Sequence, residues 1–138
     1  MASVFSSQQI RQLPDSHKII GGFRDHINGN TPSYFGRDVS YDHPNTPPVV
    51  REYLRHIHIC NPIQNHPLQW NVINNPYRRV NAQNQPQNDF VLVYWHDAIN
   101  DSYYLLMIIG PDAHNNDKWM SMLVKLAESA RKKDLNLK

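Results

Sequence analysis

Two histidines separated by one residue, His56 and His58, are the most informative chemical feature of this sequence. They lie in residues 55–60, where polar and apolar residues alternate as in a strand with one buried face. Because successive side chains of a strand point to opposite faces, the two imidazoles share one face. Such a pair suits proton transfer near neutral pH, or binding of a metal ion. The alternative is two half-exposed strand histidines that are satisfied by water.

A metal site on this pair would need at least one more ligand. His66, His96 and His114 are available, but none stands at a spacing that indicates a metal site by itself. The sequence has no C-x-x-C pair, no phosphate-binding glycine loop and no recognisable serine or cysteine nucleophile motif. We therefore expect no metal and no other cofactor, and a metal-dependent enzyme built on His56 and His58 is the alternative.

A loop that precedes the histidine strand carries the second group of chemically useful residues. It contains Arg37, Asp38 and Asp42 among aromatic residues. A cation, carboxylates and aromatic rings so close together could contact a phosphate and a base. The alternative is structural: Gly36 would supply a turn with positive φ, and Phe35 would anchor the loop in the core. Arg37 would then pair with one of the two aspartates.

The secondary structure that the sequence predicts around these residues indicates one α+β domain over residues 1–138. Val4 and Phe5 indicate a short first strand, and a helix with one apolar face begins near Pro14-Asp15-Ser16 and ends at Gly29. The apolar runs 90–95 and 103–109 predict a hairpin in the middle of a sheet, because both faces of each strand are apolar. Residues 61–88 contain four prolines and predict a long loop rich in proline and asparagine.

A last amphipathic helix begins after Asn115, which suits an N-cap. Its apolar residues recur at spacings of three and four and are Trp119, Met122, Leu123, Leu126, Ala127 and Ala130. From residue 118 onward the chain has six basic and two acidic residues, whereas the first 117 residues are net negative. The basic side chains on this helix that could contact RNA phosphates are Lys118, Lys125, Arg131, Lys132 and Lys133. The alternative is an ordinary solvated helix face.

Length and composition exclude several classes of protein. A chain of 138 residues supports one hydrophobic core, and 40% hydrophobic with 19% charged residues is too apolar for a disordered chain. The N-terminal residues do not resemble a signal peptide, and no apolar run approaches the roughly 20 residues that span a bilayer. The single cysteine, Cys60, has no partner for an internal disulfide. We expect a cytoplasmic protein without a membrane partner.

Several of these segments, taken in order, resemble the YafO family of toxins. The match covers about residues 35–131 and includes the loop, the histidine pair, the first hairpin strand and the last helix. Its pieces are Phe35-Gly36-Arg37-Asp38, Tyr41-Asp42, His56-Ile57-His58, Leu92-Val93-Tyr94, Pro111 with His114, and Met122, Leu126, Ala127 and Ala130. The loop between His58 and Leu92 is longer than the family pattern, which leaves its role open.

The resemblance implies a RelE-like fold, namely a twisted antiparallel sheet with an N-terminal helix and a C-terminal amphipathic helix. It also implies an endoribonuclease toxin that cleaves messenger RNA on the translating ribosome, and a cognate YafN-like antitoxin as partner. RNA cleavage of this kind needs a proton acceptor, a proton donor and a cation at the phosphate. We assign the two proton-transfer roles to His58 and His114, with the order of the two left open, and place Arg37 at the phosphate. His56 and Asp42 are orienting or substitute groups. A non-catalytic toxin that acts by occupying its target is a further alternative.

Overall fold

The computed structural model describes residues 2–82 and 84–137, so Lys138, the last basic residue of the chain, lies outside it. Five strands form one mixed sheet in the order β1-β5-β4-β3-β2. Their bounds are β1 Ser3–Ser6, β2 Asp38–Ser40, β3 Arg55–Ile59, β4 Phe90–Asp97 and β5 Ser102–Ile109. The predicted hairpin is confirmed, because β4 and β5 are antiparallel neighbours and lie inside the sheet.

The four neighbouring strands β2 to β5 are antiparallel, but the first strand is not. β1 pairs in parallel with β5, so the expectation of a fully antiparallel sheet is wrong at this edge. The physical reason lies in the residue after the strand. Ser7 caps the short helix α1 (Gln8–Arg11) and also donates a hydrogen bond from Oγ to the carbonyl of Leu106 (2.7 Å). These contacts fix the direction of β1, which a four-residue pattern does not encode.

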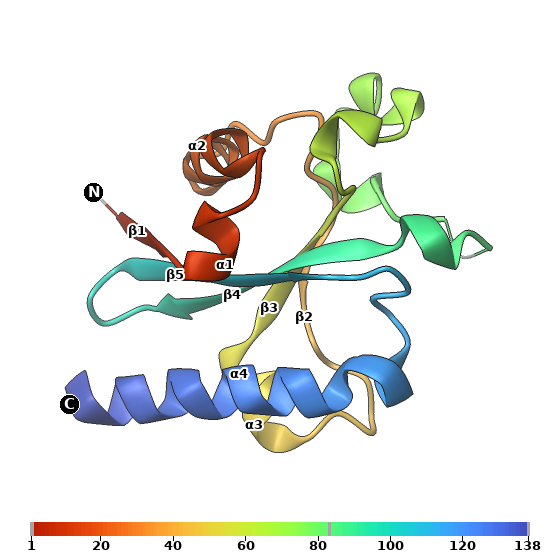
Figure 1. The fold of residues 1–138 in the computed structure, drawn as a ribbon. Coiled ribbons are helices and arrows are strands. Elements are labelled where there is room, and N and C mark those ends of the chain that lie inside the picture. The colour runs from red at the N-terminus through yellow and green to blue at the C-terminus, as the bar shows by residue number, and fades with distance from the viewer. Residues whose placement is uncertain (1, 83, 138) are drawn as a thin grey trace.

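Helices cover both faces of the sheet (Figure 1). α1 and α2 (Ser16–Ile27) lie on one face, and α3 (Pro48–Tyr53) and α4 (Asn116–Leu137) lie on the other. The predicted first long helix is confirmed as α2, with Ile19 and Phe23 buried and Gly29 beyond its end at φ +91°. α3 was not predicted, because six residues are too few to show a helical period.

Each face of the sheet has its own hydrophobic core. On the α2 side, Phe23 packs with Phe35 and Ile57, which confirms Phe35 as a core anchor. On the α4 side, Leu123 and Ala127 pack with Val91 and Val93, and the last amphipathic helix is thereby confirmed. Because successive side chains of a strand point to opposite faces, β4 contributes Leu92 and Tyr94 to the α2-side core and Val91 and Val93 to the α4-side core. In the part of the chain that the structure describes, no helix is long and apolar enough to cross a membrane.

The long loop is built from four short 3₁₀ helices rather than from extended chain. They are η1 Ile63–Asn65, η2 Leu68–Asn71, η3 Pro76–Arg78 and η4 Pro86–Asn88. Buried Arg79 fastens this loop to the rest of the molecule. Its Nη1 donates to the carbonyls of Pro32 and Phe35 (2.9 Å each), and its Nε and Nη2 donate to the carbonyl of Ile73 (3.0 and 2.7 Å). The guanidinium thus uses carbonyl oxygens as partners.

Gly36 is required for close packing and not for a left-handed turn. Its φ is not among the positive values of the described residues, so the expectation of a positive φ there is wrong. A Cβ at this position would lie 2.4 Å from the carbonyl oxygen of Arg79 and 3.0 Å from the ring of Trp70. The glycine therefore lets the long loop approach the segment that leads into β2.

Candidate active site

Three imidazoles that are far apart in the sequence meet on the α4 side of the sheet. His56 and His58 extend from β3, opposite Val93 and Val91 of β4, and His114 lies in the connection between β5 and α4. The ring centroid of His114 is 4.9 Å from that of His58 and 5.7 Å from that of His56. The prediction that the strand histidines share a face is confirmed. Both are buried, so they are not the half-exposed pair of the alternative.

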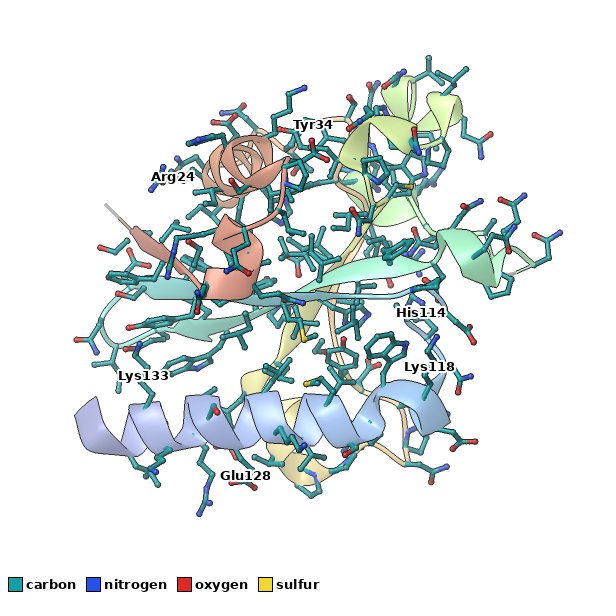
Figure 2. All side chains as sticks on the ribbon, viewed as in Figure 1. Arg24, Tyr34, His114, Lys118, Glu128 and Lys133 are labelled. Carbon is teal, nitrogen blue, oxygen red and sulfur yellow. The ribbon has the colours of Figure 1, made fainter. Side chains whose placement is uncertain are left out.

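The imidazoles line an open cleft of about 830 Å³. Arg37 and Asp42 also line it, so the structure brings all five predicted catalytic residues to one cavity. Figure 2 shows His114 beside this end of the sheet, just before the start of α4. The position follows from the order of the strands. β4 lies between β3 and β5, so the end of β3 is close to the end of β5 and to the start of α4.

His114 is held by a carboxylate that the sequence did not single out. Its Nδ1 lies 2.7 and 2.9 Å from the two carboxylate oxygens of Asp89, and its backbone N–H donates to the same group (2.8 Å). Burial acts to raise the pKa of Asp89, but the hydrogen bonds from His114 and Asn81 outweigh it and hold this pKa below its usual value. An ionised carboxylate only accepts hydrogen bonds, so Nδ1 of His114 carries the proton. Nε2 of the neutral ring is then free to accept one.

His58 has the opposite arrangement of its proton. The backbone N–H of Asn81 donates to Nδ1 of His58 (3.0 Å). A backbone N–H cannot accept a hydrogen bond, so Nδ1 has no proton and the neutral ring carries it on Nε2. Burial, with the nearby His114 and Arg37, lowers the pKa of His58 to about 4. In the free protein His58 is therefore neutral near pH 7.

His56 lies deeper than the other two imidazoles. It stacks on the ring of Tyr41 at a centroid distance of 4.1 Å, and its Nδ1 is buried without a hydrogen-bond partner among the described residues. Burial, with the repulsion that His58 and His114 exert when they are protonated, lowers the pKa of His56 to about 3. This ring is a neutral group behind the other two, so it supports them more readily than it exchanges protons with a substrate.

Arg37 contacts the long loop instead of an aspartate. Its Nε donates to the carbonyl of Tyr77 (2.6 Å), and its guanidinium lies 4.0 Å above the centre of the Tyr77 ring. Among the described residues Arg37 pairs with neither Asp38 nor Asp42, which contradicts the alternative assignment. Asp42 is exposed at the cleft and makes no hydrogen bond with the described residues.

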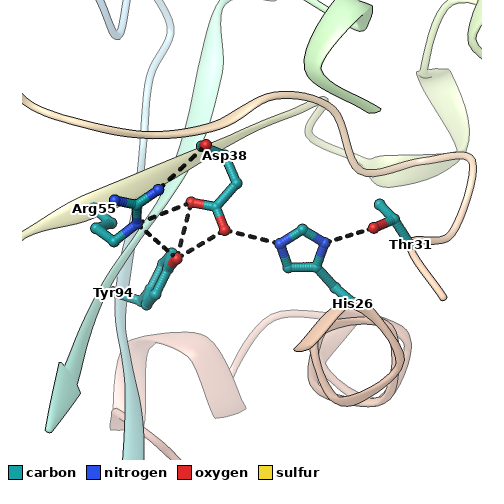
Figure 3. Close-up of polar contacts among 5 residues, drawn as sticks. All are labelled: His26, Thr31, Asp38, Arg55 and Tyr94. Atoms are coloured by element: carbon teal, nitrogen blue, oxygen red, sulfur yellow. Dashed lines mark hydrogen bonds and ion pairs between the residues drawn. The ribbon is translucent and has the colours of Figure 1, made fainter. Parts of the chain in front are cut away.

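Asp38 belongs to a separate polar cluster on the α2 side of the sheet (Figure 3). It accepts hydrogen bonds from the hydroxyl of Tyr94 and from Nε2 of His26 (2.8 Å each), and Arg55 lies 3.4 Å away. Burial acts to raise the pKa of Asp38, but the hydrogen bonds from His26 and Tyr94 lower it below the usual value. Nδ1 of His26 in turn contacts Thr31. This cluster joins α2 to β2 and lies away from the three imidazoles.

The five predicted RNA-binding side chains do not share one surface of α4. Lys118, Lys125 and Lys132 are spaced by seven residues, so they follow one line of the helix, on the side opposite the buried residues. Arg131 pairs with Glu128 (3.4 Å), and Lys133 lies over the ring of Tyr104 at 4.0 Å. The residue of this set nearest the cleft is Lys118, one helical turn after His114 (Figure 2).

The three imidazoles also form the group of described residues that could hold a metal ion. One ring nitrogen from each lies within 4.8 Å of the others. A neutral imidazole that binds a metal through Nε2 must carry its proton on Nδ1. On His58 that position faces the N–H of Asn81, so binding there would require this hydrogen bond to break. Protonation of His58 would require the same change at Nδ1, so this hydrogen bond favours the neutral, metal-free ring in the free protein.

Asp89 and Asn81 are the site residues that sequence reasoning missed. Asp89 directly precedes the apolar run of β4, and a carboxylate at the start of a central strand could have been noticed. Asn81 gave no signal, because it is one of eight asparagines in residues 61–88. Its side-chain amide donates to Asp89 (2.8 Å) and to the carbonyl of Phe90 (2.9 Å). The long loop therefore supplies a residue that contacts both arms of the site.

Known proteins with similar sequences identify the family of this chain. No solved structure matches the chain. The chain is similar to the mRNA interferase toxin YafO of Escherichia coli strain K12, with 32% identity over 109 residues that cover 75% of this chain and 74% of that protein. The family described as toxin YafO of type II toxin-antitoxin systems matches residues 24–132, which include the cleft and all three imidazoles. The chain belongs to the YafO toxin family.

Proposed function

We propose that this protein is the toxin of a type II toxin-antitoxin system and that it cleaves messenger RNA on the translating ribosome by histidine acid-base chemistry. Membership of the YafO family and the relative named an mRNA interferase toxin support the reaction. The observation that carries the mechanism is the opposite proton placement on two neighbouring rings. Nε2 of His114 is free to accept a proton, and Nε2 of His58 carries one. One cleft thus contains a base and a donor.

In the proposed reaction, Nε2 of His114 takes the proton of the ribose 2′-hydroxyl. The 2′-oxygen forms a bond to phosphorus while the bond from phosphorus to the 5′-oxygen breaks. In the complex His58 takes up a proton at Nδ1, where that proton replaces the hydrogen bond from Asn81, and the resulting imidazolium gives its Nε2 proton to the leaving oxygen, so the products are a 2′,3′-cyclic phosphate and a 5′-hydroxyl. The negative phosphate opposes the effects that lower the pKa of His58, and therefore favours the protonated donor in the complex.

The other predicted residues have supporting roles in this proposal. Nη1 and Nη2 of Arg37 make no hydrogen bond with the described residues, so they are available to the phosphate oxygens. His56 packs behind His58 and limits its movement, with ring centroids 5.9 Å apart. Asp42 orients the incoming RNA from the exposed part of the cleft. Asp89 holds His114 in the tautomer that the base requires.

The partners proposed for this chain are a translating ribosome with its messenger RNA and a cognate YafN-like antitoxin, which places its action in the cytoplasm. A net charge of +2 gives weak attraction to free RNA, so the ribosome would supply alignment. The lysine line formed by Lys118, Lys125 and Lys132 is the surface proposed to meet ribosomal phosphates. The mixed sheet with helices on both faces supports a RelE-like fold as a proposal.

The test of this function is cleavage of one transcript with and without translating ribosomes at matched free magnesium. We expect efficient cutting by the purified protein only during translation, and loss of cutting and of growth arrest with His114→Ala. Equal cutting of naked RNA would remove the ribosome from the mechanism. Arrested translation with intact RNA would support the alternative in which the toxin acts by occupancy.

A metal-dependent nuclease is the second candidate, and the three clustered imidazoles favour it. In that case activity would follow a bound metal in stoichiometric amount, and a strong chelator followed by buffer exchange would remove it. Metal analysis of the purified protein separates the two candidates. Full activity of metal-free protein on isolated ribosomes with restored magnesium supports the acid-base reaction.

A further inference from the structure

The ring of Tyr77 is exposed in the cleft, and the proposed proton transfer does not use it. It belongs to the long loop, and its residue is 56% exposed although the ring is large and mostly apolar. We propose that Tyr77, backed by Arg37, is a stacking site for one unpaired nucleobase next to the scissile phosphate. This inference rests on the proposed function and names how the site holds its RNA.

The backbone at Tyr77 is fixed from two sides. Asn75 caps the short helix η3 by accepting a hydrogen bond from the backbone N–H of Tyr77 (3.1 Å). The carbonyl of Tyr77 accepts the 2.6 Å hydrogen bond from Nε of Arg37. The guanidinium lies 4.0 Å above one face of the ring, so the remaining exposure belongs to the edges and the other face. A ring held in this way loses little freedom when a base stacks on it.

Tyr77 also lies within reach of the reacting groups. It lines the same cleft as His58, His114 and Arg37. The backbone N–H of His58 donates to the carbonyl of Arg37 (2.9 Å), so the residue whose guanidinium backs the Tyr77 ring is a direct neighbour of the proposed donor. A phosphate bound by the guanidinium of Arg37 would bring its adjoining base close to the Tyr77 ring, because the guanidinium lies against that ring. Single-stranded RNA is the chemical class that joins a phosphate and a planar ring in this way.

The surroundings of the ring favour a nucleobase over a protein side chain. Besides Tyr77, the large hydrophobic residue exposed in the cleft is Val80, at 39% exposure, and most other lining groups are polar or charged. Every base has a flat π-surface, so stacking on tyrosine needs no particular base and adds affinity at each cut site. The Arg37 cation on the far side of the ring adds phosphate attraction.

The test combines a change in the ring with a change in the base. Tyr77→Phe keeps an aromatic ring, and Tyr77→Leu removes it but keeps the backbone contact with Arg37. Single-turnover cleavage is measured on ribosome-bound messenger RNA, intact or with one abasic ribonucleotide at each position flanking the mapped cut. We expect Tyr77→Leu to slow cleavage of intact RNA roughly tenfold, in line with the loss of one stacked base, and Tyr77→Phe to change it little.

The decisive result is non-additivity. At one flanking position the abasic site should slow the unsubstituted protein by a similar factor and should slow Tyr77→Leu no further. Leu68→Ala is the control, because Leu68 is exposed on the same loop but does not line the cleft. Additive losses at every position would overturn the stacking site, as would unchanged cleavage by Tyr77→Leu with weaker antitoxin binding. If the unsubstituted protein cuts no translated RNA, the proposed function itself fails.

Discussion

The backbone N–H of Asn81 donates to Nδ1 of His58, and this 3.0 Å contact determines which nitrogen of the ring carries the proton. The side-chain amide of Asn81 also donates to Asp89, the carboxylate that orients His114. One residue of the long loop is thus connected to both proposed proton carriers. The long loop is therefore part of the site and not an addition beside it.

Replacement of Asp89 by Asn tests the orientation of the base. An amide at this position can donate to Nδ1 of His114, which would place the ring proton on Nε2 and remove the base. We expect Asp89→Asn to slow cleavage by about 100- to 10,000-fold, the contribution of a general base. The measurement is single-turnover cleavage of translated RNA.

Asp112→Asn is the matched control, because Asp112 lines the same cleft and loses the same charge. Its side chain contacts Asn115 and not a histidine of the site. An equal loss with both variants would mean that the cleft needs negative charge and that the orientation of His114 is unimportant.

Replacement of Asn81 by Ala separates the two contacts of this residue. The backbone N–H remains, so His58 should keep its proton on Nε2, as ¹⁵N NMR of the imidazole nitrogens can establish. Asp89 loses its amide partner, and we expect cleavage to slow by roughly tenfold, the effect of one hydrogen bond of about 1.4 kcal/mol. A change of tautomer on His58 in this variant would contradict the role given to the backbone contact.

Because the strand histidines are buried, we expect the free energy of unfolding to decrease as the pH is lowered, at pH values above those at which the carboxylates take up protons. The pKa of His56 is about 3 and that of His58 about 4 in the folded protein, both below the unfolded value of 6.5. As pH falls through 6.5, the unfolded chain binds protons that the folded protein does not, so the free energy of unfolding decreases. The decrease ends where the folded protein takes up the same protons, near pH 4 for His58 and pH 3 for His56.

Urea denaturation between pH 7 and pH 4 measures this slope. The pKa values of Asp38 and Asp89 lie below the usual value of 3.8, so most of their contribution is lost below this window. His56→Gln should reduce the slope, whereas His17→Gln, at an exposed position, should leave it unchanged. An undiminished slope in His56→Gln would show that this ring does not account for the pH dependence.

Arg79 predicts how firmly the long loop is held. Arg79→Met leaves the carbonyls of Pro32, Phe35 and Ile73 without their donor, and we expect it to lower the free energy of unfolding by about 2 to 4 kcal/mol. Arg78→Met is the control, because the neighbouring arginine is exposed and should change stability by less than about 0.5 kcal/mol. Equal urea midpoints for the two variants would contradict the anchoring role.

Local patterns predicted the parts of the molecule in which one residue type repeats at a fixed spacing. The hairpin, α2, α4 and the shared face of His56 and His58 are of this kind. The three residues of β2 and the six of α3 are too few for a period. Asp89 and Asn81 depend on how the long loop returns to the sheet, and tertiary contacts such as those of Arg79 decide this. No spacing in the sequence encodes them.

The chemical nature of the new RNA ends tests the central claim most directly. Purified protein is added to ribosomes that translate a defined messenger RNA, and the end groups at the mapped cut are determined. Attack by the 2′-hydroxyl, with His114 as base and His58 as donor, predicts a 2′,3′-cyclic phosphate upstream and a 5′-hydroxyl downstream. A 3′-hydroxyl with a 5′-phosphate would show that water attacked the phosphorus, and would contradict the mechanism.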